Sequence, residues 1–353
     1  MISHLKNRIT GDKIAKVQSK FYMEALFMKA KNVLYRVFCS SFMAAGSMYA
    51  FNKFHSIYAL KNHILTSSPE NYFKWNGERI YYNCIGKGEP VLLLHALHPA
   101  ASAEEWQLIT ESLSKDHKVF VLDLPGCGRS SKSRLKYTGY YYIKLIEEFM
   151  NAMALSEIPV VASNLTSAIA IMASAYDPSL FSKIVLISPP SISVLSEKPD
   201  FISKLKNLFL EMPISGTFIY KLLCSKPQID LAFTEQYFYN PFHDTDDLVD
   251  TYFESSQIGD GKGHYFAGRM LGKYIHIDVS HVLTHFKTPV KIIEGAETND
   301  GAQVITEWTA LNPRISVSEI EHTKKLPHME EPELTVREIC SFIDESDVMN
   351  ESN

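Results

Sequence analysis

The sequence lacks the motifs by which most metal, disulfide and nucleotide sites are recognised. Its five cysteines are scattered over 353 residues without a Cys-x-x-Cys, which argues against a disulfide framework and against a zinc site. It contains no Walker loop, no His-Glu-x-x-His and no Gly-x-Gly-x-x-Gly after an expected strand. We therefore expect no metal and no cofactor, and unpaired thiols in a reducing, cytoplasmic compartment.

An excess of charge of one sign is also absent. Lysine and arginine total 35 and aspartate and glutamate total 40, which gives a net charge of -5. Nothing in this balance indicates a basic surface for nucleic acid, so we expect no nucleic-acid partner. Hydrophobic residues make up 46% of the chain, which is enough for one large domain or two modest ones.

A long apolar run near the N-terminus is missing as well. The uncharged stretch 37–51 is shorter than the about 20 residues that a spanning helix needs, and it contains several serines. Eight basic residues and only two acidic ones precede it. Three interpretations remain open: a helix packed on the folded domain, an amphipathic or anchoring helix at a membrane surface, and a weak signal-anchor. A membrane surface is thus one expected partner, through residues 37–51.

From about residue 72 the chain alternates between expected strands and expected helices. Continuous apolar runs bounded by turn residues predict strands buried on both faces, and apolar residues at helical spacing predict the helices between them. The expected strands are 78–85, 90–95, 118–124, 158–163, 183–188, 290–295 and 315–320. This order predicts an α/β fold with a mostly parallel sheet and helices on both of its faces.

One long interruption separates the last two expected strands from the others. Residues 191–285 are rich in aromatic residues, leucine and lysine at helical periods and contain no comparable apolar strand, which predicts an inserted helical cap. We therefore divide the chain into a basic N-terminal arm with an apolar helix (1–71), a core in two parts (72–190 and 286–345), the cap and a polar tail (346–353).

Five segments carry motifs in a recognisable order. They are LLLHALHPAAS (92–102), DLPGCGRSSKS (123–133), VVASNLTSAIAIMA (160–173), VKIIEGAETND (290–300) and KKLPHMEEP (324–332). In this order they resemble the oxyanion strand, the Asp-x-x-Gly-x-Gly-x-Ser turn, the nucleophile elbow, the acid turn and the closing histidine segment of the α/β-hydrolase superfamily. The resemblance covers about residues 72–345 and implies the α/β-hydrolase fold.

The resemblance implies a catalytic serine, acid and histidine at three positions that carry other residues here. It places Asn164 on the nucleophile, Thr298 on the acid and Lys325 on the histidine. An amide cannot be activated to an oxyanion, and threonine cannot hold the negative charge that steadies an imidazolium. A lysine acting as a base near pH 7 needs a pKa far below its usual value of about 10.4. Asn164 does tolerate the positive φ of a strained bend.

Other residues near these positions are alternative catalytic candidates. A serine–lysine pair can act in nucleophilic catalysis, so Ser163 or Ser167 with Lys325 is one alternative. Asp300 follows the acid position by two residues, and His328 follows the histidine position by three. The resemblance gives the histidine at position 328 a structural role in most members of the superfamily.

The resemblance also places an oxyanion hole and a pocket wall in this chain, at His95, Ala96, Leu97 and Leu165. Our leading hypothesis is a catalytically inactive or strongly weakened member of the superfamily. It would keep a capped pocket for a small apolar molecule or serve as an interaction module for an unidentified protein partner. The alternatives are an ester-type hydrolase with a rearranged serine–lysine site and a membrane-surface scaffold recruited by the N-terminal segment.

Overall fold

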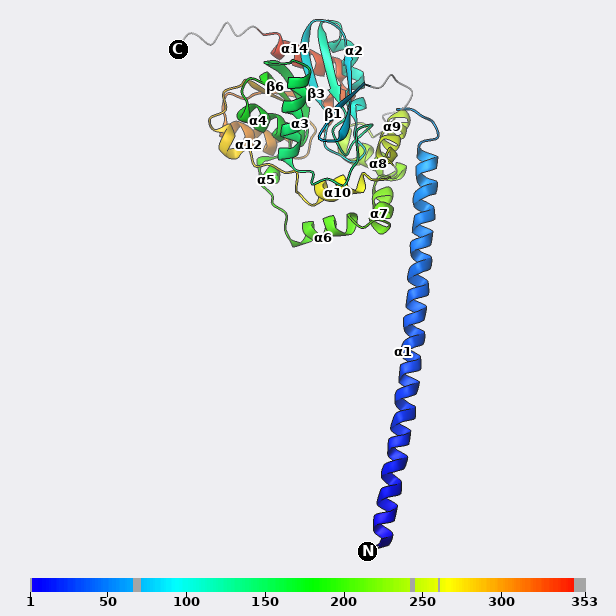
Figure 1. Cartoon of the computed structure of the whole chain (residues 1–353). Helices are drawn as coiled ribbons and strands as arrows, with labels where there is room; N and C mark the ends of the chain where they lie inside the picture. Colours follow the sequence, from blue (N-terminus) through cyan, green and yellow to red (C-terminus); the bar gives the residue numbers. More distant parts are fainter. Residues whose placement is uncertain (1, 66–70, 242–244, 260, 346–353) are drawn as a thin grey trace. The chain divides into compact units, whose positions relative to one another are not determined.

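A computed structural model describes residues 2–65, 71–241, 245–259 and 261–345 (Figure 1). The chain divides into two compact units, residues 1–51 and 52–353. The polar tail predicted for residues 346–353 lies outside the described residues.

Helix α1 (Ile2–Ala59) contains the apolar segment 37–51, which is helical throughout. Over the whole length of α1, apolar residues are not gathered on one face. Within the described ranges, no helix is long and apolar enough to cross a bilayer. The sequence placed the end of the N-terminal arm at residue 71, whereas the second compact unit begins at Asn52.

The second unit is built around an eight-stranded sheet, which confirms the predicted mostly parallel arrangement. The strands are β1 (Asn71–Trp75), β2 (Glu78–Ile85), β3 (Glu89–Leu94), β4 (His117–Leu122), β5 (Ile158–Ser163), β6 (Phe181–Ile187), β7 (Val290–Gly295) and β8 (Ser316–Ile320). They lie in the order β1-β2-β4-β3-β5-β6-β7-β8. Only the pairs β1–β2 and β2–β4 are antiparallel. The parallel strands therefore bring their carboxyl ends to one edge of the sheet.

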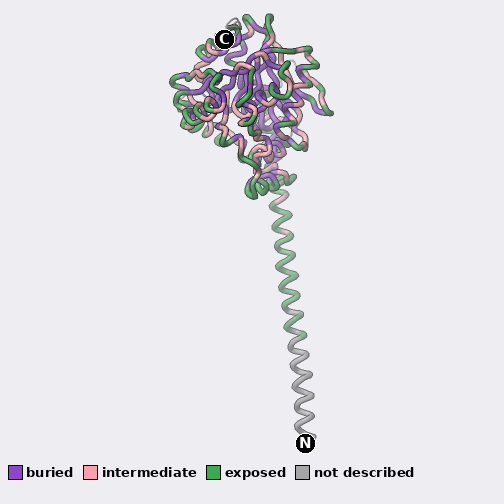
Figure 2. Tube along the Cα trace, turned by 90° about the vertical axis from the view of Figure 1, so that its left-hand side faces the viewer, coloured by how far each residue is buried: buried purple, intermediate pink, exposed green. Residues whose placement is uncertain are grey.

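Helices cover both faces of the sheet because its central strands are apolar on both sides. On one face lie α3 (Gly139–Ala152), α4 (Thr166–Tyr176) and α12 (Gly301–Leu311), packed against alternate residues such as Leu92 and Leu94. On the other lie η1 (Ala103–Trp106), α2 (Gln107–Leu113) and α14 (Pro332–Ile343), packed against Val91 and Leu93. Buried residues accordingly fill the interior of this unit (Figure 2).

The chain between β6 and β7 contains helices and, in its described part, no strand. These inserted helices are α5 (Ile192–Leu195), α6 (Phe201–Leu210), α7 (Ser215–Leu223), α8 (Lys226–Ala232), η2 (Phe233–Tyr237), α9 (Asp246–Gln257), α10 (His264–Leu271) and α11 (Ser280–Leu283). The short helix α13 (Pro327–Glu330) follows β8. The insertion thus begins where a strand reaches the carboxyl edge of the sheet, which is where ligands bind in open α/β sheets.

Residues 52–65 are tied to the inserted helices by buried polar contacts. The Lys221 ammonium of α7 donates to the carbonyl of Asn52 at 2.6 Å. The Glu254 carboxylate of α9 accepts from the backbone N–H groups of Ile64 and Leu65 at 2.9 and 3.0 Å. Because Lys221 and Glu254 are both buried, these contacts hold this segment against α7 and α9.

A buried ion pair organises the turn after β4. Asp123 accepts hydrogen bonds from the backbone N–H groups of Ala103 (2.6 Å) and Arg129 (2.7 Å) and from the Arg129 Nε (2.8 Å). Gly128, with φ +50°, passes so close to the Asp123 carboxylate that a Cβ there would lie 2.3 Å from it. Burial raises the pKa of Asp123, but the charge and hydrogen bonds of Arg129 outweigh this and lower it. The pair joins the turn to the start of η1.

We expect Asp123→Asn to destabilise the fold by about 3 kcal/mol, because it leaves the buried Arg129 guanidinium with the half-buried Glu104 as its remaining carboxylate partner, at 2.9 Å. Urea denaturation of the full chain measures this loss. Asp116→Asn, which removes an exposed carboxylate, is the control and should change the free energy of unfolding by less than about 0.5 kcal/mol. Equal effects of the two substitutions would contradict the assignment of the Asp123–Arg129 ion pair as a stabilising contact.

Candidate functional site

The bend between β5 and α4 is centred on Asn164, which has a positive φ of +52°. Its backbone N–H donates to Ile187 in the neighbouring strand at 2.9 Å. The Thr166 hydroxyl donates to the carbonyls of Ser163 (2.6 Å) and Leu94 (3.1 Å), which ties the start of α4 to two strands. Asparagine is one of the few residues that accept this backbone conformation at low cost, so it fits the bend without the reactivity of a serine.

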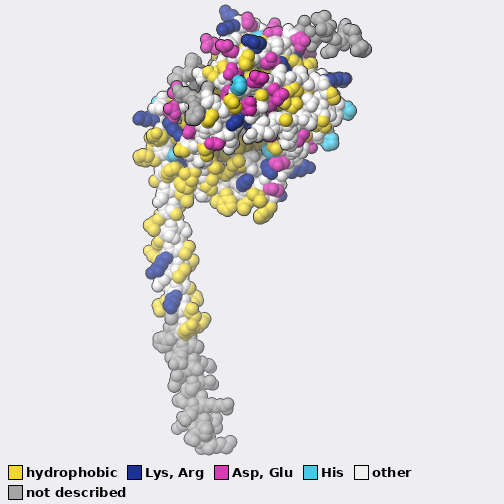
Figure 3. All heavy atoms as spheres, turned by 180° about the vertical axis from the view of Figure 1, so that it is seen from behind, with side chains coloured by type: hydrophobic (Ala, Val, Ile, Leu, Met, Phe, Trp, Pro, Cys, Tyr) yellow, Lys and Arg dark blue, Asp and Glu magenta, His cyan; other side chains and the backbone are white. Residues whose placement is uncertain are grey.

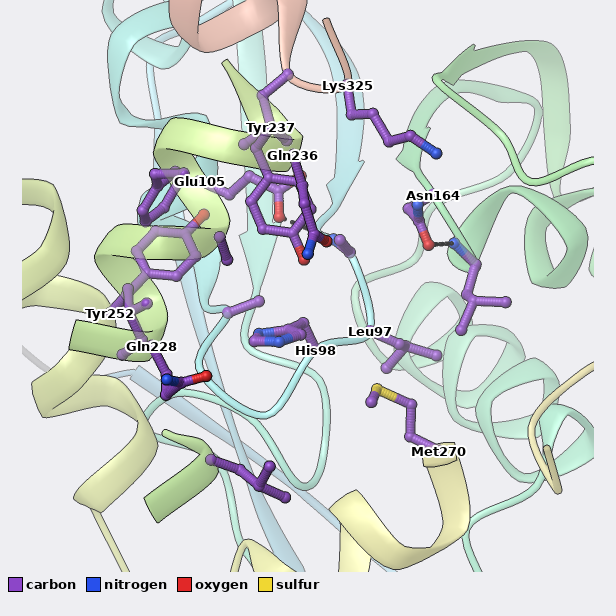
Figure 4. A pocket seen from close by; sticks show the side chains of 18 of the residues that line it. Leu97, His98, Glu105, Asn164, Gln228, Gln236, Tyr237, Tyr252, Met270 and Lys325 are labelled. Carbon is purple, nitrogen blue, oxygen red and sulfur yellow. Dashed lines mark hydrogen bonds between the residues drawn. The ribbon is translucent and has the colours of Figure 1, made fainter. Parts of the chain in front are cut away.

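The side chain of Asn164 turns back on its own backbone. Its Oδ1 accepts a hydrogen bond from the backbone N–H of Leu165 at 2.8 Å (Figure 4). In an α/β-hydrolase, the N–H of the residue after the nucleophile is one of the donors that bind the oxyanion. Here that donor is occupied by the residue standing at the nucleophile position.

A second backbone donor near the bend is also occupied. The N–H of Ala96, after β3, donates to Oε2 of Glu105 at 2.9 Å. The preceding His95 is buried and bonded at both ring nitrogens, to the Ala96 carbonyl (2.7 Å) and to the Leu124 N–H (2.9 Å). His95 therefore holds the turn, and Leu97 lines the pocket beside it.

Glu105 forms a buried acidic centre next to the bend. The Nε2 of His328 lies 3.4 Å from its Oε1, and the His328 ring packs on Trp106 with centroids 4.6 Å apart. Burial would raise the pKa of Glu105, but the interactions with His328, His95 and Ser163 lower it overall. Glu105 is thus held as an anion. His328 has no exposed surface and does not line the pocket, unlike a base that meets a substrate.

The structure does not bring the alternative serines to Lys325. Ser163 is buried against Glu105, and the Ser167 hydroxyl donates to the Ala162 carbonyl at 3.3 Å. Neither serine lines the pocket. A nucleophile needs a base within hydrogen-bonding reach, and among the described residues neither hydroxyl has Lys325 as a partner.

Lys325 instead pairs with Asp300. Its Nζ lies 3.0 Å from Oδ1 and 3.2 Å from Oδ2 of that carboxylate. Lys325, at the predicted histidine position, is therefore paired with Asp300. Asp300 lies two residues beyond Thr298, which stands at the predicted acid position. The Lys325 Nζ is thus engaged by a carboxylate and not by a serine hydroxyl.

A second buried acid lies behind this pair. Glu294, at the end of β7, is only 1% exposed, and burial raises its pKa to about 7. The hydroxyls of Thr298 and Ser188 and the charge of Lys325 oppose this rise, and Asp300 adds to it. Thr298 therefore faces a buried carboxyl group.

A pocket of about 530 Å³ lies over the bend, between the core and the inserted helices (Figure 4). From the core it is lined by the segment after β3, the bend and Lys325, and from the insertion by the end of α7 and by α8, η2, α9 and α10. Its apolar and aromatic wall includes Leu97, Leu165, Ile229, Phe233, Tyr252 and Met270. Polar groups are fewer and include His98, whose pKa burial lowers to about 4 and which is therefore neutral.

The sheet order, the strained bend after β5 and the inserted helices define an α/β-hydrolase, which confirms the fold expected from the motifs. The family model for the alpha/beta hydrolase fold matches residues 89–332. The chain therefore belongs to the alpha/beta hydrolase fold family.

Individual relatives are more distant. The chain is 25% identical over 127 residues to a 2-hydroxy-6-oxo-6-(2'-aminophenyl)hexa-2,4-dienoic acid hydrolase of Metapseudomonas resinovorans, covering 35% of this chain and 44% of that protein. It is 31% identical over 133 residues to the 1-acylglycerol-3-phosphate O-acyltransferase ABHD5 of Mus musculus, covering 35% and 36%. The match thus spans less than half the length of either curated relative.

Solved structures resemble the fold over a longer stretch. A thermophilic esterase from Thermogutta terrifontis superposes with a TM-score of 0.63 at 16% identity, covering 78% of this chain and 98% of that one. A serine hydrolase involved in carbazole degradation superposes equally well, at the same identity.

Two acids of the site did not emerge from the motifs. Glu105 sits in an expected helix, where a charged residue normally faces solvent, and its only signal is its place next to Trp106. Glu294 does have a signal, because it is a carboxylate inside the apolar run that precedes Gly295. A charge in a strand buried on both faces requires partners or a shifted pKa.

The raised pKa of Glu294 predicts a pH dependence of stability. An acid whose pKa is higher in the folded state than in the unfolded state does not change the free energy of unfolding below its unfolded pKa. As the pH rises from there toward the folded pKa, here about 7, this acid destabilises the fold. Glu294→Gln, which mimics the protonated acid, should therefore gain stability relative to the natural chain between about pH 5 and pH 8, by about 3 kcal/mol. Urea denaturation across this pH range measures the gain.

Glu319→Gln, an exposed carboxyl group on β8, is the control and should give the same pH profile as the natural chain. A Glu294→Gln profile that runs parallel to the natural one would contradict the buried, protonated state of Glu294.

Proposed function

We propose that this chain is a catalytically inactive or strongly weakened α/β-hydrolase that binds a small, mostly apolar molecule in the pocket between its core and its inserted helices. The observation that carries the proposal is the hydrogen bond from the Leu165 N–H to the Asn164 Oδ1. This bond puts an unreactive amide at the bend and occupies an oxyanion donor at the same time. The reaction centre thus lacks both an attacking oxygen and a free donor from this residue.

The Lys325–Asp300 pair supports the same proposal. A hydrolase needs a group that accepts a proton from the nucleophile and later returns it. The Lys325 Nζ is paired with Asp300, and Thr298 faces Glu294 and not a base. The histidine of the closing segment, His328, is buried between Glu105 and Trp106.

The size and the lining of the pocket support the binding of a small molecule that is not chemically converted. Its size is within the usual range for small-molecule sites, and its wall is mostly apolar with a few polar groups, among them Gln228, Gln236 and Tyr237. The strongly charged side chains of its core side, Glu105 and Lys325, already have protein partners. A neutral, mostly apolar molecule with one or two hydrogen-bonding groups fits this lining.

The opposing hypothesis is an ester-type hydrolase, which the similarity to a dienoic acid hydrolase and to a thermophilic esterase would suggest. It requires Ser163 or Ser167 to reach a base, and both are buried away from the pocket wall. A role as a membrane-surface scaffold through residues 37–51 remains a separate proposal, which does not depend on the pocket.

We expect the natural chain to resist labelling by a serine-directed fluorophosphonate and to leave p-nitrophenyl butyrate intact. The triple variant Asn164→Ser, Thr298→Asp, Lys325→His should gain measurable hydrolysis of this ester, because it restores the nucleophile, acid and base and frees the Leu165 N–H. The same triple with Asn164→Ala is the matched control and should stay inert. Labelling of the natural chain that disappears in Ser163→Ala or Ser167→Ala would instead establish the hydrolase.

Ligand binding is tested with the neutral apolar dye Nile red. Ala232→Trp, on the pocket wall at the end of α8, should fill the pocket and weaken dye binding by about tenfold. Ala302→Trp, on an exposed position of α12, adds the same side chain elsewhere and should bind the dye like the natural chain. Equal titration curves for the two variants would show that the dye does not occupy the pocket and would count against the proposal.

A further inference from the structure

Helix α6 exposes most of its apolar residues and buries two uncharged polar ones, Ser203 and Asn207, together with Leu210. Phe201 is 79% exposed, Ile202 61% and Leu208 57%, whereas the residues turned inward include Ser203 and Asn207. A surface helix normally shows the opposite arrangement. In the space-filling view of Figure 3, hydrophobic side chains gather along the lower end of the domain, where Figure 1 places α6 and α7.

The buried side of α6 explains why this orientation is stable. Asn207 donates to Glu211 at 3.1 Å, and the carbonyl of Leu210 contacts the His264 ring nitrogen at 2.6 Å. Gly268 of α10 lets α6 approach closely, because a Cβ there would lie 3.0 Å from Asn207 Oδ1. The inward side of α6 is thus fixed by packing of Leu210 and Asn207 against α10, and this packing leaves the apolar face turned to the outside.

The exposed apolar surface continues from α6 along the inserted helices to the mouth of the pocket. We call it the α6–α7 face, and it comprises Phe201, Ile202, Leu205, Leu208, Phe209, Met212, Ile214, Leu222 and Leu223. Leu223 both belongs to this face, with 49% exposure, and lines the pocket. Leu231, 50% exposed, also lines the pocket. An apolar surface of this extent on a folded domain marks an interaction site.

Basic residues accompany the α6–α7 face. Lys204 and Lys206 are exposed within α6, and Lys198 precedes the helix. In the part of the chain that the structure describes, none of the three forms an ion pair. The nearby acids are engaged: Glu197 pairs with Lys273 at 3.1 Å, and Glu211 pairs with Arg269 at 3.1 Å. The face therefore offers apolar side chains next to unpaired positive charges.

We propose that the α6–α7 face docks on the surface of an anionic phospholipid membrane. An amphipathic helix of this kind lies in the interface with its apolar face among the acyl chains and its lysines at the headgroups. Docking would set the mouth of the pocket, at Leu223 and Leu231, against the lipid. This favours a bilayer over a second protein chain as the occupant, because an apolar molecule would then reach the pocket without crossing water.

The docking surface is distinct from residues 37–51, and it does not depend on whether the chain is catalytic. Because the full chain contains both segments, the test must report on α6 itself. We expect the fluorescence of Phe209→Trp, after subtraction of the natural tryptophans, to be quenched by vesicles of brominated phosphatidylcholine with phosphatidylglycerol. Leu108→Trp, on an exposed position of α2, is the matched control and should be quenched far less.

Vesicle sedimentation of the full chain provides the second measurement. Leu205→Glu with Phe209→Glu should lower the affinity for phosphatidylglycerol-containing vesicles by about tenfold, because it puts charge into the apolar face. Leu108→Glu with Leu334→Glu makes the same charge change elsewhere and should bind like the natural chain. High salt should weaken binding by the natural chain.

Two outcomes would overturn the proposal. One is equal quenching of Phe209→Trp and Leu108→Trp together with unchanged sedimentation of the Leu205→Glu, Phe209→Glu variant. The other is a chain that is dimeric without lipid and becomes monomeric in that variant while vesicle binding stays the same. The α6–α7 face would then be an interface between copies of the chain.

Discussion

The sharp bend at Asn164 is the constraint on which the site depends. The chain leaves β5 and enters α4 within two residues, Asn164 and Leu165, and Asn164 adopts the positive φ that this sharp bend requires. In a hydrolase this strain serves to present a nucleophile. Here the strain is kept, but the asparagine satisfies itself through the Leu165 N–H. The architecture of the bend therefore persists with an amide at the position of the nucleophile.

The acidic residues around the bend follow the same principle. Three carboxyl groups lie near the site, and the negative charge of each is either stabilised by neighbouring groups or avoided by protonation. Glu105 is held as an anion by the Ala96 N–H and by the nearby His328, and Asp300 is paired with Lys325. For Glu294, burial outweighs the hydroxyls of Thr298 and Ser188 and the charge of Lys325, which favours the protonated form. None of the three is placed to orient a histidine toward the pocket, which is what the acid of a triad does.

Much of the fold is predictable from the sequence, because strands buried on both faces leave continuous apolar runs. The runs at 158–163 and 290–295 match β5 and β7 residue for residue. The pairing of Lys325 with Asp300, and of Ala96 with Glu105, is not predictable in this way, since it depends on distances between segments far apart in the chain. The orientation of α6 could not be predicted from the sequence either. Helical spacing of apolar residues indicates a helix, but here it does not indicate which face of the helix meets the core.

The residues at the three triad positions, Asn164, Thr298 and Lys325, influence what the pocket can accept. A catalytic site must leave charged or reactive groups free to meet the substrate, and those groups also discourage a purely apolar occupant. In this chain Asn164 and Lys325 line the pocket, but Asn164 is hydrogen-bonded to the Leu165 N–H and Lys325 is paired with Asp300. Binding a neutral molecule then leaves no buried charge unpaired, so little desolvation cost opposes it. Such a molecule would also partition into lipid. A pocket mouth bordered by exposed leucines is consistent with a ligand that enters from a membrane.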